Sequence, residues 1–159
     1  MQDARIHTTS DGWALDSFIV LFGLHEADYQ DHVGTVQREL ATHLRRQEQC
    51  ALPPFSPRAR RSGPGHRQAR AFPVMPKFDL QPDARSSSWR LSIVCADRAG
   101  LLYDFAVLFS AHKIDLKMAK IHTLGERVED TFIIEGKQLA DTQARRGFET
   151  ALLDTLNGH

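Results

Sequence analysis

A short turn at residues 97–102 holds the side chains and main chain best suited to bind a small ligand. Its sequence is Asp97-Arg98-Ala99-Gly100-Leu101-Leu102. Alternating apolar residues end before it and helically spaced ones begin after it, so it is expected to join a strand to a helix. Gly100 would let main-chain N–H groups approach a ligand, and the helix N-terminus favours a carboxylate, as in an amino acid. The alternative is that Asp97 only caps the helix and Gly100 only permits the turn.

Two acidic residues occupy matching positions in expected strands, each two residues before a phenylalanine. The pairs are Asp16 with Phe18 and Asp130 with Phe132. Side chains of a strand alternate between its faces, so each acid shares a face with an apolar ring. A buried acid needs a partner, and basic residues of neighbouring strands, Arg5 and Lys120, are expected to supply it. We prefer a structural role to ligand contact, because the feature also occurs where no binding turn precedes it.

The remaining reactive side chains predict neither a metal site nor a catalytic centre. Cys50 and Cys95 stand alone, without a CxxC motif, and Cys95 is interpreted as core packing. His32 and His43 share an expected helix but lie too far apart for one metal ion. The sequence has no Gly-Ser turn followed by paired Asp-x-Asp ligands, and no His-Asp doublet with companion histidines. Metal-dependent nucleotidyl transfer and hydrolysis are therefore not expected.

The second half of the chain predicts a strand, a helix, two strands and a helix. These elements are expected at residues 89–95, 101–112, 114–123, 128–134 and from Asp141 onward. The two central strands are close enough to form an antiparallel hairpin, and Asp141 is expected to cap the last helix. This order predicts an α+β fold of the ferredoxin-like kind, with helices on one face of an antiparallel sheet. The usual fourth strand is missing from the pattern.

Residues 50–88 are interpreted as a linker, because all seven prolines lie between Pro53 and Pro82. Residues 72–80 alternate enough to form an edge strand, which would supply the fourth strand unless a partner does so or the sheet stays three-stranded. The linker is basic, with no acidic residue between Glu48 and Asp79. A solvated connector is preferred to a nucleic-acid site, because no aromatic residues are interleaved with the arginines.

The first 49 residues repeat part of the second half. Residues 4–9 align with 119–124 with four identities, and residues 15–20 align with 129–134 through a shared Asp-x-Phe-Ile. A helix follows each copy, at 28–46 in the first. Residues 1–49 are therefore interpreted as the second half of one domain, and residues 89–159 as a second, whole domain. We expect Met1 to lie inside a larger ancestral protein, as a truncated product or a fragment.

Three stretches carry a resemblance to a known family. They read A-D-R-A-G-L-L-Y from Ala96, K-I-H-T-L-G-E-R-V-E-D-T-F from Lys120, and D-A-R-I-H-T-T-S-D-G-W-A-L-D-S-F from Asp3. Together they resemble the C-terminal tandem ACT domains of bifunctional uridylyltransferase/uridylyl-removing enzymes, which modify PII signal proteins. Asp-Arg-x-Gly-Leu-Leu marks many ACT domains, and the Gly-Glu-Arg-Val-Glu-Asp hairpin narrows the choice. The family usually has proline where this chain has Ala99, so a looser turn is expected.

The resemblance implies a non-catalytic regulatory segment in nitrogen metabolism that senses glutamine or another small amino acid. No cofactor is expected, since Mg²⁺ would belong to catalytic domains upstream of the ACT pair. Partners would be other ACT units, in a homo-oligomer or the parent enzyme, and PII only through the full-length enzyme. The implied effector-binding residues are Asp97, Arg98, Ala99, Gly100, Leu101, Leu102, Lys120 and Ile121. The alternative is an ACT-type assembly module that binds no small molecule and pairs through open strand edges.

Length and composition fit this interpretation. The chain has 159 residues, of which 42% are hydrophobic and 25% charged, as in a globular protein. Twenty basic and twenty acidic residues cancel, so no overall field attracts nucleic acid or an anionic membrane. No apolar run approaches the roughly 18 residues that cross a membrane, and the N-terminus lacks a signal-peptide segment. We expect the protein to be cytoplasmic.

Overall fold

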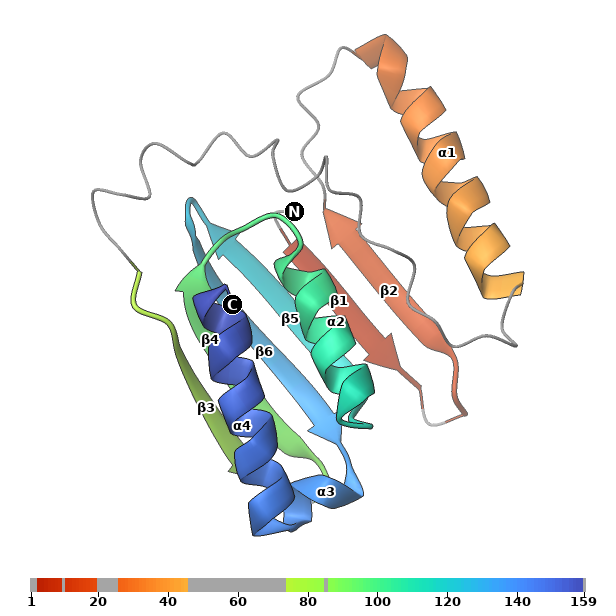
Figure 1. The fold of residues 1–159 in the computed structure, drawn as a ribbon. Coiled ribbons are helices and arrows are strands. Elements are labelled where there is room, and N and C mark those ends of the chain that lie inside the picture. Colours follow the sequence, from red (N-terminus) through yellow and green to blue (C-terminus); the bar gives the residue numbers. More distant parts are fainter. Residues whose placement is uncertain (1–2, 10, 20–25, 46–73, 85, 159) are drawn as a thin grey trace.

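One antiparallel sheet of six strands is formed within residues 3–9, 11–19, 26–45, 74–84 and 86–158, which the computed structural model describes (Figure 1). Its strands are β1 (Asp3–Thr8), β2 (Ala14–Ile19), β3 (Lys77–Pro82), β4 (Trp89–Ala96), β5 (Asp115–Leu124) and β6 (Arg127–Glu135). The helices of the same residues are α1 (Glu26–Arg45), α2 (Leu101–Ala111), α3 (Lys137–Ala140) and α4 (Thr142–Asn157). The strands lie in the order β2-β1-β5-β6-β4-β3.

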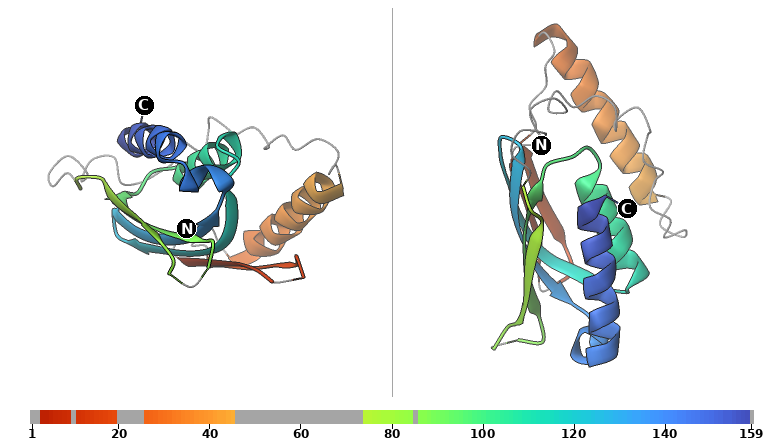
Figure 2. Two further views of the ribbon diagram at one scale, coloured as in Figure 1. Left: turned by 90° about the horizontal axis from the view of Figure 1, so that it is seen from below. Right: turned by 60° about the vertical axis from the view of Figure 1, so that its left-hand side comes forward.

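The second half of the chain confirms the predicted α+β, ferredoxin-like arrangement. The elements β4, α2, β5, β6 and α4 follow one another in the expected order, and α2 and α4 lie side by side on one face of the sheet (Figure 2). The main-chain N–H of Ala144 donates to Oδ1 of Asp141 at 2.7 Å, which confirms the predicted cap of α4. The one-turn helix α3 was not predicted, because four residues give no periodicity to detect.

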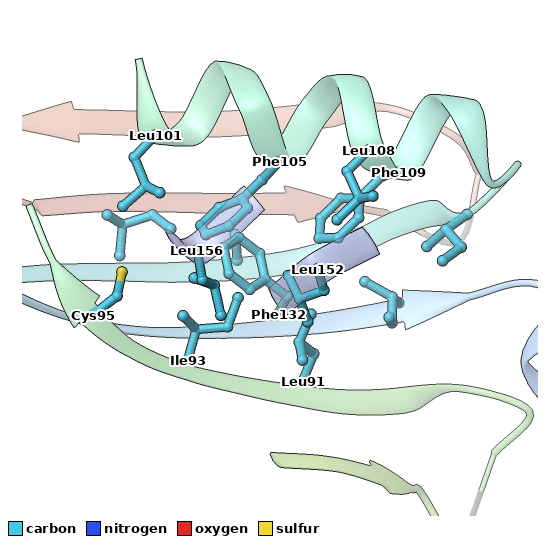
Figure 3. Packing of buried hydrophobic residues seen from close by; sticks show 14 of the residues in the cluster. Leu91, Ile93, Cys95, Leu101, Phe105, Leu108, Phe109, Phe132, Leu152 and Leu156 are labelled. Atoms are coloured by element: carbon cyan, nitrogen blue, oxygen red, sulfur yellow. The ribbon is translucent and has the colours of Figure 1, made fainter. Parts of the chain in front are cut away.

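The core lies between α2, α4 and the inner faces of the central strands (Figure 3). Four phenylalanine rings form its centre. The ring of Phe132 in β6 meets those of Phe105 and Phe109 edge to face, with centroids 5.6 Å apart in each pair. The ring of Phe148 in α4 lies 6.2 Å from that of Phe109. These ring contacts hold the two helices to the sheet.

Strand β3 takes the place of the fourth strand. It pairs with β4 in antiparallel register from Lys77 opposite Val94 to Pro82 opposite Trp89. The side chains of Phe78 and Leu80 are half-buried against the core, while their neighbours in β3 are exposed. The strand therefore begins later than the predicted 72–80. Residues 72 and 73, with the arginine-rich part of the predicted linker, lie outside the described residues.

The two copies of the repeat meet through equivalent strands. In the antiparallel pair of β1 and β5, Ala4 lies opposite Ile121 and Arg5 opposite Lys120. Ala4 aligns in sequence with Ala119, and Arg5 aligns with Lys120 itself. The Arg5–Lys120 pair therefore marks a local two-fold centre between the copies. Ala4 is buried, so β1 belongs to the sheet of the second copy.

The outer strand β2 is exposed along its whole length, which contradicts the expectation that Asp16 is a buried acid paired with Arg5. Asp16 lies opposite Ile6 in the register, whereas Arg5 lies opposite Ser17. Strand alternation therefore places Asp16 and Arg5 on opposite faces. The ring of Phe18 is likewise 54% exposed, because α1 lies outside the layer formed by α2 and α4 (Figure 2).

None of the helices in the described ranges combines the length and the apolar character needed to cross a membrane.

Candidate functional site

A cavity of about 300 Å³ opens between the first turn of α2 and the strands β5 and β6. This volume is at the lower end of what small-molecule sites occupy. The cavity brings together the predicted turn at residues 97–102 and Ile121. Its full lining is Asp97, Arg98, Ala99, Gly100, Leu101, Leu102, Tyr103, Ile121, Thr123, Val128 and Asp130.

The first turn of α2 has no side-chain cap. Its N-cap residue is Gly100, whose φ of 86° and ψ of 2° lie in the left-handed region that favours glycine. Asp97 is exposed and makes no capping bond to the helix; its main-chain N–H donates instead to the carbonyl of Glu126 at 2.7 Å. The alternative in which Asp97 caps the helix is therefore wrong. The helix N-terminus faces the cavity with the partial positive charge that attracts an anion.

Gly100→Ala is expected to lower the free energy of unfolding by about 1 kcal/mol or more, because a Cβ is disfavoured at positive φ. Gly147→Ala is the matched control. Gly147 lies inside α4, and a new Cβ there would meet no described atom within 4 Å apart from its chain neighbours and the backbone of its own helix, so alanine should stabilise by about 0.5–1 kcal/mol. Urea unfolding followed by circular dichroism measures both changes. Equal effects of the two substitutions would contradict the special role of Gly100.

Arg98 joins the turn to both helices. Its guanidinium donates from Nη1 to Oδ2 of Asp104 in α2, and from Nη2 to the carbonyl of Thr155 in α4 at 2.9 Å. Arg98 also borders a second hollow between the two helices. Nη1 and Nη2 are therefore engaged within the protein, while the buried Nε has no partner among the described residues. We interpret Arg98 as a residue that positions the turn against the end of α4.

Asp130 is the most unusual residue of the cavity wall. It is 1% exposed and lies in β6 on the face that carries Val128 and Phe132. Its Oδ1 accepts a hydrogen bond from the main-chain N–H of His122 at 3.1 Å, while its Oδ2 finds no donor among the described residues. Burial raises the pKa of the Asp130 carboxyl to about 7, against the lowering effect of the His122 N–H.

Lys120 does not pair with Asp130, and that expectation was wrong. Its exposed side chain alternates with the buried Ala119 and Ile121, so it lies on the outer face of the sheet. There it lines a different hollow together with Arg5 and other residues, and it is absent from the wall of the cavity at the turn. Of the two effector-binding residues predicted outside the turn, Ile121 contributes to the cavity and Lys120 does not.

Three further wall residues were not predicted: Tyr103, Thr123 and Val128. Two of them could have been predicted, because every second side chain of a strand points to the same face of the sheet. Thr123 follows Ile121 by two positions, and Val128 precedes Asp130 by two.

Among the described residues, the other reactive side chains do not form a cluster that could act as a catalytic or metal centre. Cys95 is buried in the core, and burial raises the pKa of its thiol to about 11. Within the described residues, no group of three or more His, Cys, Asp or Glu side chains is placed to hold a metal ion.

Comparisons with known proteins place almost the whole chain against one kind of enzyme. It is 51% identical to the bifunctional uridylyltransferase/uridylyl-removing enzyme of Bordetella pertussis over 99% of its length, and 48% identical to that of Bordetella avium. The enzyme of the same name from Cupriavidus metallidurans is 41% identical over 98% of the chain. The chain spans 18% of the length of each of these relatives. No family model matches the chain, and no solved structure does. Along nearly all of its length, this chain is therefore a relative of one region of the bifunctional uridylyltransferase/uridylyl-removing enzymes.

Proposed function

We propose that this chain is a non-catalytic regulatory segment of the ACT type that binds glutamine and acts in nitrogen regulation in the cytoplasm. The observation that carries the proposal is the cavity at the uncapped N-terminus of α2, lined by the turn that resembles the ACT motif. The transferase and removing activities named for the relatives would belong to the remainder of those longer proteins. In this proposal the chain contributes recognition and no chemistry of its own.

The ligand carboxylate would lie at the first turn of α2, where the main-chain N–H groups and the helix dipole favour negative charge. Apolar wall residues, among them Leu101 and Val128, would contact the aliphatic part of the ligand. Residue 99 is alanine where the family usually has proline, but the turn keeps Gly100. The main chain can therefore still approach the ligand closely. The arrangement suits a compact ligand with one anionic end.

Strand β5 connects the cavity wall with the first copy of the repeat. Ile121 and Thr123 form part of the wall, and the same strand pairs with β1 of the first copy. A ligand shifts an equilibrium only through its different affinity for two states. Glutamine would therefore favour one arrangement of the paired copies by binding beside the strand that joins them.

Isothermal titration calorimetry tests the proposal directly. We expect saturable heat with glutamine at one site per chain, and much weaker heat with glutamate. Thr123→Phe should abolish binding, because the ring fills the cavity, whereas Thr131→Phe should not, because Thr131 lines the outer hollow instead. Folded samples that give no heat with either amino acid would refute glutamine sensing.

The second candidate function is assembly without a ligand, and the exposed strand β2 favours it. The side chains of Trp13 and Leu15 are 74% and 68% exposed. An open edge with exposed apolar side chains is a typical place for another strand or domain to associate. In that case sedimentation would show oligomers whose size does not change with glutamine.

A further inference from the structure

We infer that Asp130 recognises the amino group of the ligand, so that the cavity takes a zwitterionic amino acid and rejects a simple carboxylate. This inference rests on the proposed function and adds a specificity-determining residue to it.

The cavity wall contains two groups of opposite electrostatic character. The first turn of α2 at Gly100 offers main-chain N–H groups and a partial positive charge, which suit a carboxylate. Asp130 on β6, in the wall of the same cavity, offers a carboxyl group, which suits an ammonium group when ionised. Buried apolar side chains, including Leu101 and Ile121, lie in the same wall. An α-amino acid needs these three features together, because its carboxylate and ammonium groups are bonded to one carbon atom and its side chain extends from the same atom.

The hydrogen bonding of Asp130 leaves one oxygen for such a ligand. Oδ1 is used by the N–H of His122, but Oδ2 is buried without a donor in the part of the chain that the structure describes. Buried polar atoms in native proteins almost always have a partner, since an unsatisfied one costs free energy. A ligand N–H group at Oδ2 would supply the missing bond.

The basic side chains of Arg98 and Lys120 do not donate a hydrogen bond to Oδ2 of Asp130. Nη1 and Nη2 of Arg98 donate to Asp104 and to the carbonyl of Thr155, and its buried Nε has no partner among the described residues. Lys120 lies on the outer face of the sheet. A purely structural acid at position 130 would be expected to have one of them as a partner, and it has neither.

The test compares two ligands and three proteins by calorimetry at pH 8, where the Asp130 carboxyl is ionised. The ligands are glutamine and 4-carbamoylbutanoate, which is glutamine without its α-amino group. The proteins are the wild type, Asp130→Asn and Asp16→Asn. Asparagine keeps an oxygen for the N–H of His122 and removes the charge. Asp16 is the matched control, because it holds the equivalent repeat position but is exposed and outside the cavity.

We expect the wild type and Asp16→Asn to bind glutamine about 10- to 100-fold more tightly than 4-carbamoylbutanoate, as a charge-assisted hydrogen bond provides. Asp130→Asn should lose most of that preference by weakening glutamine binding alone. If the wild type binds both compounds equally, or Asp130→Asn keeps the preference, the role of Asp130 is refuted while amino-acid sensing stands. If the folded wild type binds neither glutamine nor any other amino acid, both proposals fail. If Asp130→Asn does not fold, the wild-type ratio alone decides.

Discussion

Asp130→Asn is expected to make the ligand-free protein more stable than the wild type at pH 7 and above, with a gain that shrinks toward pH 4. In the folded protein burial raises the pKa of Asp130 to about 7, whereas an exposed Asp titrates near 3.8. Between these values the folded state retains a proton that the unfolded state has released. The contribution of protonated Asp130 to stability is therefore complete below about pH 4 and is lost as the pH rises through about 7.

The size of this change follows from the difference between the two pKa values. At about 1.4 kcal/mol per unit, the gain of the variant over the wild type should grow by on the order of 2–4 kcal/mol between pH 4 and pH 8. Urea unfolding of both proteins across this range measures it, and subtracting one curve from the other removes the titration of other groups. A constant difference across the range would show that Asp130 is not neutral in the folded protein near pH 5.

Leu152→Ala is expected to destabilise the protein by about 2–5 kcal/mol, because it removes a fully buried side chain from the contact between α4 and the sheet. Figure 3 shows the Leu152 side chain over β6 and β4, among Phe132 and Leu91. The loss of stability within that range depends on how far the surrounding side chains move into the space left by the leucine.

Leu153 provides the matched control for this prediction. It is the next residue of α4, with the same side chain and 42% exposure. Leu153→Ala should change the free energy of unfolding by less than about 1 kcal/mol, since a large part of the leucine surface is already in water and alanine is a good helix former. Similar losses for both variants in chemical denaturation would contradict the assigned orientation of α4.

Local patterns were enough to predict the elements of the second half and the turn that borders the cavity. Apolar residues recur at every second position in residues 89–95 and at helical spacing in residues 101–112. These segments correspond to β4 and α2, with boundaries that differ by one residue. Gly100 was expected at a strand-to-helix turn, and it adopts positive φ there. These features depend on neighbours in sequence, which is why a single sequence is sufficient to predict them.

Which strand residues line the cavity depends on the face of the sheet to which each side chain points. The prediction of these faces was partly wrong. Lys120 and Ile121 are adjacent in β5, so only one of them can point to the cavity, and this was readable from the sequence. That Asp130 has an unpaired oxygen could not be predicted, because it depends on Arg98 being held by α2 and α4. The register of β1 on β5 is similarly a long-range property.

The sheet differs at its two sides in its capacity to extend. On the β3 side, Pro82 lacks an N–H group and the exposed Lys77 and Asp79 carry charge, which together discourage an added strand. On the β2 side, the described strand contains no proline and carries exposed Leu15 and Ile19. An additional strand is consequently expected to join beside β2, next to the first copy, while β3 stays the outermost strand on the other side of the sheet.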